Sequence, residues 1–197
     1  MGEGLPLTCV MLRDATLRQM SYRPITDIWF LARAKLKGGE KYYGAYLGGF
    51  PERARVLLGA SIDDPVLHVC GGKARLYPYK GGFGPNDKTL DLDEALQPDF
   101  WQDASARGYP QGFRAMLADP PYSAVDAAHY APGSNAYPAP NKIVENMINA
   151  LPVGSRAGII HYILPKGPAN TKFLACVGIV CGFNNRMRCF SVFEKVS

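Results

Sequence analysis

The feature of this sequence that most constrains its fold is the alternation of short apolar segments with polar or small-residue connections. Each apolar segment has the length of a β-strand and is followed by glycine, proline or acidic residues, which end strands. Strands are predicted in five places: Val66–Cys70, 87–95, 98–104, Ala115–Ala118 and 155–166. Strands that alternate with connections in this way favour an α/β protein with one open, mainly parallel sheet.

The other regular segments are two helices, a last strand and one segment that fits two assignments. A short helix is expected over Pro51–Leu58, with proline in its first turn and Gly59 as its end. A second helix is expected after Asn141 as N-cap, because apolar residues recur there at helical spacing. Residues 186–196 indicate a final strand, whereas residues 170–183 fit a helix or a strand.

Residues 123–140 are predicted to form a loop, because alanine, serine, proline and glycine dominate them. Loops of that length are usually functional or mobile. Residues 1–20 are weakly patterned, and we expect a loose N-terminal arm there. The chain has 197 residues, 47% of them hydrophobic, which is enough for one sizeable core. One domain over residues 21–197 is therefore expected.

The cysteines and the apolar runs indicate the cellular compartment. Five cysteines, an odd number, show neither a paired disulfide framework nor a C-x-x-C metal motif. This pattern favours reduced thiols in the cytoplasm and no bound metal. The longest strongly apolar run, residues 173–183, is shorter than the ~20 residues that a membrane-spanning helix needs. No export signal opens the sequence.

The net charge of +5 is unevenly distributed along the chain. No acidic residue occurs between Glu145 and Glu194, and this interval suits a phosphate backbone. Its basic residues are Arg156, Lys166, Lys172, Arg186 and Arg188. The segment Asp87–Asp103, with six acids and one base, suits a neutral or cationic ligand instead. For the basic interval, the solvated face of a slightly basic protein is the alternative interpretation.

Three chemically distinctive stretches lie in or directly after the last part of predicted strands. They are Cys70–Ala74, Asp91–Asp93 and Asp119–Tyr122. In open parallel sheets, ligands bind at the carboxyl ends of the strands, near the point where the strand order reverses. We therefore expect the three stretches to lie together at one edge of the sheet.

The sequence Asp119-Pro120-Pro121-Tyr122, at the end of the fourth of these five predicted strands, resembles the S-adenosylmethionine-dependent amino-methyltransferases. It most resembles the DNA methyltransferases that modify the N6 amine of adenine or the N4 amine of cytosine, and the likeness covers about residues 40–196. The resemblance implies a single-domain, Rossmann-like class I methyltransferase fold with an antiparallel last strand. Small, compact enzymes of this kind are frequent in phages. A proline-rich turn with a buried aromatic residue is the purely structural alternative.

The chemistry of amine methylation explains the residue types in this motif. The lone pair of an exocyclic amine is delocalised into the base, so the amine is a poor nucleophile. Asp119 and a backbone carbonyl of the turn can accept its hydrogen bonds and aim the lone pair at the sulfonium methyl group. Pro120 and Pro121 fix the backbone that carries these acceptors. Tyr122 would stack on the target base after the base leaves the duplex.

The resemblance implies S-adenosyl-L-methionine as cofactor, bound by a glycine turn after the first of the five strands. Family members carry an acid before a Gly-x-Gly pattern there, and His68, Gly72 and Ala74 occupy the matching positions. Cys70 and Gly71 complete the turn. His68 lies where the family has an acid, and a core histidine is as consistent with it as a pocket residue. Residues 75–88 are too short and too rich in proline and glycine for the family's long first helix.

Acidic and aromatic residues complete the expected cofactor site. Asp91 is favoured over Asp93 for the ribose hydroxyls, because Leu90 and Leu92 are expected to face inward together. Asp103 is expected near the adenine amine. Phe100 or Trp101 would lie beside the adenine ring, although core packing explains both aromatic residues slightly better. Tyr43 belongs to a tyrosine- and glycine-rich segment that suits either a loop over the ligand or a partly buried turn.

The expected partner is nucleic acid, DNA rather than RNA, and no membrane partner is expected. The sequence does not indicate the oligomeric state. The sequence shows no separate recognition domain for reading bases in the major groove. An RNA amino-methyltransferase and a cofactor- or nucleic-acid-binding protein without turnover are the main alternatives. A protein-glutamine methyltransferase is disfavoured because that family favours Asn at position 119. A cytosine C5 enzyme is disfavoured because no cysteine follows a proline.

Overall fold

The computed structural model describes residues 23–34, 46–76, 82–130, 137–181 and 187–197. The expected N-terminal arm over residues 1–20 lies outside this part of the chain. The described strands form one eight-stranded sheet in the order β1-β7-β8-β6-β5-β2-β3-β4. Their bounds are β1 Ile25–Leu31, β2 Val66–Val69, β3 Lys88–Asp91, β4 Phe100–Trp101, β5 Ala115–Ala118, β6 Arg156–His161, β7 Thr171–Cys181 and β8 Met187–Lys195.

All strand pairings are parallel except those of β8, which runs antiparallel to both β6 and β7. The chain builds β2, β3 and β4 outward in one direction and then returns to place β5 and β6 on the other side of β2. The strand order therefore reverses between β2 and β5. The predicted open, mainly parallel sheet with an antiparallel last strand is confirmed.

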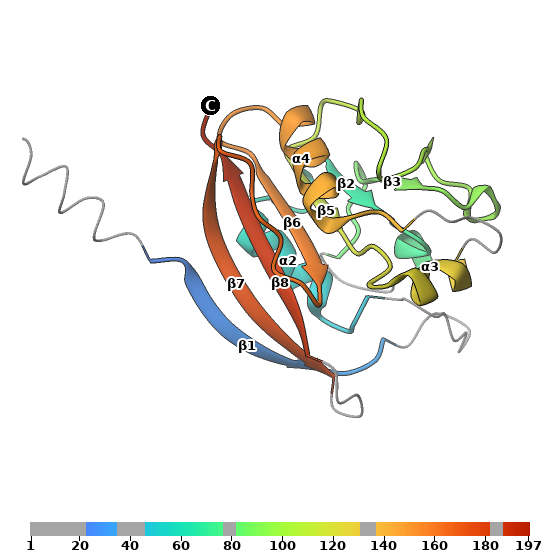
Figure 1. Ribbon diagram of the computed structural model, residues 1–197, viewed down its shortest axis with the longest axis horizontal. Helices are drawn as coiled ribbons and strands as arrows, with labels where there is room; N and C mark the ends of the chain where they lie inside the picture. Colours follow the sequence, from blue (N-terminus) through green and yellow to red (C-terminus); the bar gives the residue numbers. More distant parts are fainter. Residues whose placement is uncertain (1–22, 35–45, 77–81, 131–136, 182–186) are drawn as a thin grey trace, which may run out of the picture.

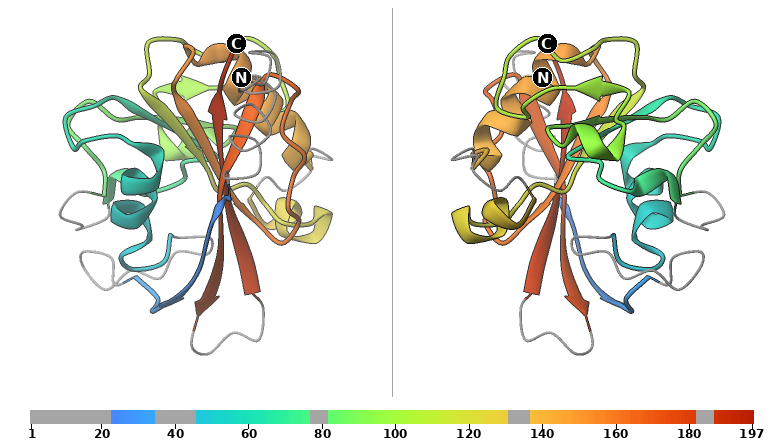
Figure 2. Two further views of the ribbon diagram at one scale, coloured as in Figure 1. Left: turned by 90° about the vertical axis from the view of Figure 1, so that its left-hand side faces the viewer. Right: turned by 90° about the vertical axis from the view of Figure 1, so that its right-hand side faces the viewer.

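Helices cover both faces of the sheet, as the two side views in Figure 2 show. Helix α2 (Phe50–Leu58) lies on one face, and α3 (Ala124–Tyr130) and α4 (Pro140–Ala150) lie on the other. Phe50, Ala54 and Leu58 of α2 belong to one buried apolar cluster of the core. A second cluster contains the apolar residues Ile143, Val144, Met147 and Ile148 of α4. The described helices include none long and apolar enough to cross a membrane.

The segment 170–183 is resolved as a strand over most of its length. In β7, Ala175, Val177, Ile179 and Cys181 are buried, and the residues between them are partly exposed. This period of two is that of a strand with one covered face. The strand β1 was not among the predictions, and it pairs with β7 along its whole length.

Helix α3 lies inside residues 123–140, so the prediction of a continuous loop was wrong. Ser123 begins the helix, because its Oγ accepts a hydrogen bond from the Asp126 backbone N–H at 3.1 Å. The same hydroxyl donates to Asp126 Oδ2 at 2.8 Å, so both the backbone and the side chain of Asp126 are bonded to the residue that caps the helix.

The predicted N-cap of the second helix was also wrong. Ala139 is the N-cap of α4, and Pro140 opens the helix. A proline suits this position because the first helical N–H has no partner within the helix. Asn141 instead accepts a hydrogen bond from the Lys166 backbone N–H at 2.9 Å, which connects α4 to the segment after β6. Between β2 and β3, the described residues contain only a short 3₁₀ helix, η2 (Ala74–Leu76).

Candidate active site

The Asp-Pro-Pro-Tyr turn begins where β5 ends, next to the reversal of strand order. All four residues of β5 are buried, which fixes the start of the turn. The backbone N–H of Asp119 donates to the Val69 carbonyl of β2 at 3.2 Å, so the turn is attached to the neighbouring strand. Asp119 is partly exposed, and its Oδ1 accepts a hydrogen bond from the Tyr122 hydroxyl at 2.5 Å. The motif therefore presents its carboxylate at the edge formed by the carboxyl ends of the parallel strands, the carboxyl edge.

Tyr122 is surrounded by aromatic rings and one cation. Its ring centroid lies 4.6 Å from that of Tyr162 and 5.4 Å from that of His161. The guanidinium carbon of Arg188 lies 5.1 Å from the centroid of the Tyr122 ring, which is cation–π geometry. Arg188 was noted in the sequence only as one of several basic residues, and no local pattern connected it with this motif.

His161 and Tyr137 hold the backbone of the turn in place. His161 Nδ1 accepts a hydrogen bond from the Ile163 backbone N–H at 2.9 Å, so the proton of the neutral ring is assigned to Nε2. Nε2 lies 3.3 Å from the Tyr137 hydroxyl, which donates to the Tyr122 carbonyl at 3.3 Å. Burial lowers the pKa of His161, against a hydrogen bond to the Pro121 backbone that raises it. A neutral His161 at neutral pH fits this arrangement.

The charge state of Asp119 is set by opposing effects. Burial raises the pKa of Asp119 to about 6, while the Arg188 guanidinium and the hydrogen bond from Tyr122 act in the opposite direction. The carboxylate is therefore mostly ionised at pH 7 and titrates in the mildly acidic range. An ionised carboxylate can only accept hydrogen bonds, which is the role that a base amine requires.

The glycine turn after β2 allows close approach of the backbone. Cys70 and Gly72 have positive φ angles of 53° and 49°. A Cβ atom on Gly71 would lie 2.8 Å from the His68 carbonyl oxygen and 3.0 Å from Thr89 Cγ2, so only glycine fits there. The Gly72 backbone N–H donates to Asp91 Oδ2 at 2.8 Å, which joins this turn to the end of β3.

Asp91 and Asp93 have different surroundings at the end of β3. Asp91 accepts backbone hydrogen bonds from Gly72 and, at 3.1 Å, from Asp93, and burial raises the pKa of Asp91. Asp93 is the N-cap of the 3₁₀ helix η3 (Glu94–Leu96) and accepts from the Ala95 N–H at 3.0 Å. Leu92 is 38% exposed, so the expectation that it faces inward with Leu90 was wrong.

Asp103 belongs to a loop that is fastened to α4. Its Oδ1 accepts from the Ser105 N–H at 2.7 Å. The next residue, Ala104, is buried, and its carbonyl accepts from the Tyr109 hydroxyl at 2.6 Å and from Asn146 Nδ2 at 3.2 Å. Sequence reasoning missed Asn146, because it is a polar residue among the apolar residues that define the helical pattern.

Four of the predicted residues, Cys70, Asp91, Asp103 and Asp119, are related electrostatically at the carboxyl edge. Burial raises the pKa of the Cys70 thiol well above its ordinary value, and the carboxylates of Asp91, Asp119 and Asp103 raise it further. The three carboxylates therefore lie near the Cys70 thiol. A thiol held in its protonated form is a poor nucleophile, so no nucleophilic role is assigned to Cys70.

The two aromatic residues of β4 have separate roles. Phe100 packs edge-to-face on Phe113 with ring centroids 6.3 Å apart, next to the second core cluster. Trp101 is 64% exposed, and its Nε1–H donates to the Leu92 carbonyl at 2.9 Å. Core packing therefore describes Phe100, and Trp101 remains at the surface.

His68 is a core histidine in a buried polar network. Its Nε2 lies 3.2 Å from Asp87 Oδ2, and its Nδ1 lies 3.3 Å from the Tyr46 hydroxyl. Asp87 also forms a buried ion pair with Arg55 of α2 and accepts from the Val66 N–H at 3.0 Å. Through Asp87, the His68 side chain thus connects β2 with α2 and with the start of β3. Sequence reasoning missed Asp87 and Arg55.

Two further expectations concern other parts of the chain. Tyr43 lies outside the described residues, so its predicted contact with the cofactor stays a prediction. Within the described ranges, no three histidine, cysteine or acidic residues gather in a way that could hold a metal ion.

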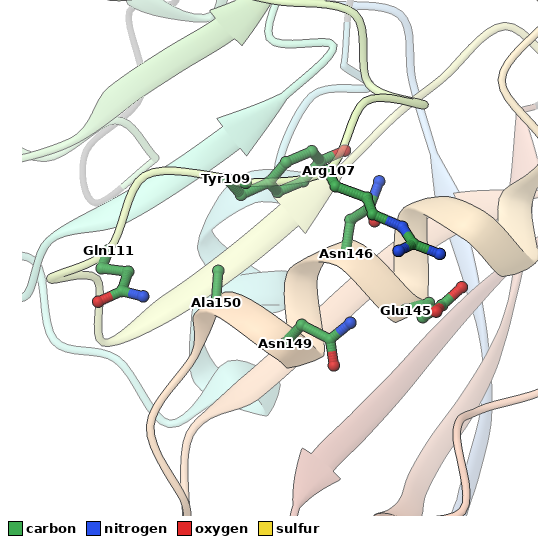
Figure 3. Close-up of a pocket in the computed structure, with 8 residues that line it drawn as sticks. Arg107, Tyr109, Gln111, Glu145, Asn146, Asn149 and Ala150 are labelled. Carbon is green, nitrogen blue, oxygen red and sulfur yellow. The ribbon is translucent and has the colours of Figure 1, made fainter.

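A pocket of about 340 Å³ lies between α4 and the loop that leads to β5 (Figure 3). Arg107 and Glu145 stand near one end of it and Gln111 near the other. Its lining includes none of the residues predicted to bind the cofactor or the base. This pocket is therefore separate from the carboxyl-edge site.

Comparisons with known proteins identify the fold through solved structures and not through the sequence. No protein-family model and no curated protein matches the sequence. Among solved structures, TrmN from Thermus thermophilus is similar at a TM-score of 0.55 and 17% identity, over 77% of this chain and 49% of TrmN. The chain thus spans about half the length of TrmN.

A second similar solved structure is matched over more of its length than TrmN is. It is the 1,6-didemethyltoxoflavin-N1-methyltransferase of Burkholderia thailandensis, which contains bound 1,6-didemethyltoxoflavin and S-adenosylhomocysteine. The TM-score is 0.50 at 14% identity, over 75% of this chain and 78% of that enzyme. Together with the strand order, these likenesses show that the chain has the Rossmann-like class I methyltransferase fold.

Proposed function

We propose that this chain is an S-adenosyl-L-methionine-dependent methyltransferase that methylates an exocyclic amine of a nucleic-acid base, adenine N6 in DNA. The observation that carries the proposal is the position of Asp119. An ionisable carboxylate stands at the carboxyl end of β5, beside the reversal of strand order, and already accepts a hydrogen bond from the Tyr122 hydroxyl. A base amine is a donor of the same kind, so it can take the place of this hydroxyl at the carboxylate.

The cofactor site is proposed from the glycine turn and the adjacent acids. Gly71 has no room for a Cβ atom, and the backbone at Gly72 is held against Asp91, so a ligand can approach the main chain closely. Asp91 and Asp103 would accept hydrogen bonds from the nucleoside part of the cofactor. The ligand of the Burkholderia enzyme, S-adenosylhomocysteine, is the demethylated form of this cofactor. When bound, S-adenosyl-L-methionine supplies an electrophilic methyl group on a sulfonium.

The residues of the motif then act on the base amine. Asp119 and a carbonyl of the Asp-Pro-Pro backbone accept hydrogen bonds from the amine protons, which directs the nitrogen lone pair outward from the base ring. Pro120 is buried and Pro121 is partly buried, so the backbone acceptors are held in a fixed orientation. Tyr122 supplies the ring on which the flipped base stacks. Direct attack of the amine nitrogen on the methyl carbon would break the carbon–sulfur bond, release S-adenosylhomocysteine and lose one amine proton to solvent, and it needs no covalent intermediate with the protein.

Basic residues support a nucleic-acid substrate only in part. Arg156 lies at the start of β6 and forms an ion pair with Glu194 at 3.0 Å, so its charge is already paired within the protein. Arg188 lies beside the motif itself, where a polyanion would approach the site. The positive charge that favours a phosphate backbone is therefore proposed to act at the carboxyl edge.

An acceptor panel tests the proposal. The protein is incubated with methyl-labelled S-adenosyl-L-methionine and, in parallel, duplex DNA, single-stranded DNA or total RNA, and the acceptor is hydrolysed to nucleosides. We expect label in N6-methyladenine from DNA. Label confined to RNA would make the DNA assignment wrong, and cofactor binding without label in any acceptor would indicate a binding protein without turnover.

A further inference from the structure

Strand β8 brings Arg188 to the same edge of the sheet as the Asp-Pro-Pro-Tyr turn. Because β8 runs antiparallel to β6, its first residues lie where β6 ends. Cys189 pairs with His161, the last residue of β6. Arg188 precedes Cys189 in the antiparallel β8, so it lies just past the end of β6, beside the segment that begins with Tyr162. A strand late in the chain thereby delivers a cation to a turn that β5 positions.

The contacts of Arg188 are directed at the motif. Its guanidinium carbon lies 5.1 Å from the centroid of the Tyr122 ring. Its side chain is hydrogen-bonded to the Tyr162 side chain, and its charge interacts with Asp119. Tyr162 in turn lies 4.6 Å from Tyr122, measured between ring centroids. Arg188 is thus held by one tyrosine while it packs on the other.

We propose that Arg188 is a positioning residue of the methyl-transfer site: its guanidinium holds the Tyr122 ring in place and keeps the Asp119 carboxylate in its charged form. This inference rests on the proposed function, in which Asp119 accepts hydrogen bonds from the base amine. A planar guanidinium suits the first task because it packs flat on an aromatic ring, and its permanent charge suits the second.

Several groups face Asp119, and Arg188 is the cation among those described. The Tyr122 hydroxyl comes from the same turn, and the Cys70 thiol from the turn after β2. His161 at the end of β6 and the next residue, Tyr162, reach Asp119 through the Tyr122 ring that they contact. Asp91 and Asp103 lie near the same thiol and add negative charge. Arg188 lowers the pKa of Asp119, whereas burial raises it. Removing the guanidinium charge should therefore leave Asp119 protonated over a wider pH range.

The test uses the variants Arg188→Met and Arg188→Lys. Because Asp119 must be ionised to act, methyl transfer should decline as pH falls through the pKa of this group. In Arg188→Met, the acid limb of the kcat profile should move upward by about one pH unit, as loss of a nearby opposite charge predicts. Arg188→Lys keeps the charge, so its acid limb should stay within a few tenths of a unit of the wild type, with reduced kcat from poorer packing on Tyr122.

Arg53→Met is the matched control, because Arg53 lies on α2, over the Trp29 ring at 5.5 Å, and its contacts among the described residues do not include the motif. Its profile should match the wild type. An unmoved acid limb in Arg188→Met, with only a lower kcat or a higher KM, would overturn the positioning role.

A measurement without turnover separates this inference from the proposed function. Carbon-13 NMR of the Asp119 carboxyl group gives its titration directly in the wild type and in Arg188→Met. The same upward shift is expected there, whether or not the acceptor panel detects methyl transfer. Identical titration curves for the two proteins would overturn the inference even if the protein proved to be an active methyltransferase.

Discussion

The two carboxylates Asp119 and Asp91 differ in the donors that they already bind. Asp91 accepts hydrogen bonds from the backbone N–H groups of Gly72 and Asp93, which are fixed parts of two turns. Asp119 accepts from the hydroxyl of Tyr122, whose O–H bond can turn to another acceptor while the ring stays in place. A carboxylate held by backbone donors suits a fixed site for the cofactor. A carboxylate with a displaceable donor suits the group that must receive each new substrate.

Replacing Asp91 by alanine should weaken binding of S-adenosyl-L-methionine. The change removes a charged acceptor and releases the Gly72 backbone, so the dissociation constant should rise about tenfold or more, as expected for loss of a charge-assisted hydrogen bond. Isothermal titration calorimetry measures this constant directly.

Asp93→Ala is the matched control, because Asp93 caps η3 and accepts only from the Ala95 N–H among the described contacts. It should cost about 1 kcal/mol of stability and leave the dissociation constant nearly unchanged. Equal constants for Asp91→Ala and the wild type would contradict the assignment of Asp91 to the cofactor.

At the level of elements, the buried polar network of Asp87, Arg55 and His68 fixes how α2 packs against the sheet. Arg55 of α2 donates to the carbonyls of Ser61 and Asp64, at 2.7 Å and 3.3 Å, and pairs with Asp87 at the entrance to β3. His68 of β2 shares the same carboxylate. A buried cation needs such partners, because an unpaired charge in the core is costly.

Asp87→Ala should strongly destabilise the protein. It leaves the guanidinium of Arg55 buried without its carboxylate, and removing one partner of a buried ion pair costs about 3–5 kcal/mol. Urea denaturation measures the free energy of unfolding. For comparison, Glu145→Ala breaks the more exposed pair with Lys142, 2.9 Å long, and should cost less than about 1 kcal/mol. Similar losses in the two variants would show that the network contributes little.

The strands around the site could be predicted from the sequence, because their signals are local. Ala115–Ala118 is an apolar run ended by an acid and two prolines, and β5 occupies the same residues. Helix α3 was missed although Ser123 and Asp126 have the spacing of a cap, because the small residues around them suggested a loop. Strand β1 was missed because its stability depends on pairing with β7, far along the chain.

The same distinction between local and distant signals holds for the candidate site. Asp119 and Tyr122 are neighbours in the sequence, so their motif is visible without a structure. Arg188 and His161 reach Tyr122 from β8 and β6, and no spacing in the sequence connects them with it. The core role of His68 depends in the same way on Asp87, which lies in another segment. Side chains that come from separate strands become neighbours only when the register of the sheet is known.

At the scale of the whole molecule, one edge of one sheet collects the candidate site. Strands β2, β3 and β5 end in the glycine turn, Asp91 and Asp119, and the antiparallel β8 begins there with Arg188. In Figure 1 these parallel strands lie side by side, and α3 is the helix that follows β5 along the chain. The central claim is therefore that this edge performs methyl transfer with Asp119 as the acceptor of the base amine.

The most direct measurement of this claim is single-turnover methyl transfer to duplex DNA by the wild type and by Asp119→Ala, with the cofactor dissociation constant measured for both. Alanine removes the hydrogen-bond acceptor, whereas asparagine would keep an acceptor oxygen at the same position. We expect a rate at least about a hundredfold lower in the variant, the scale of a lost group that acts on the reacting atom, and a dissociation constant within a factor of about two. Equal rates would contradict the account.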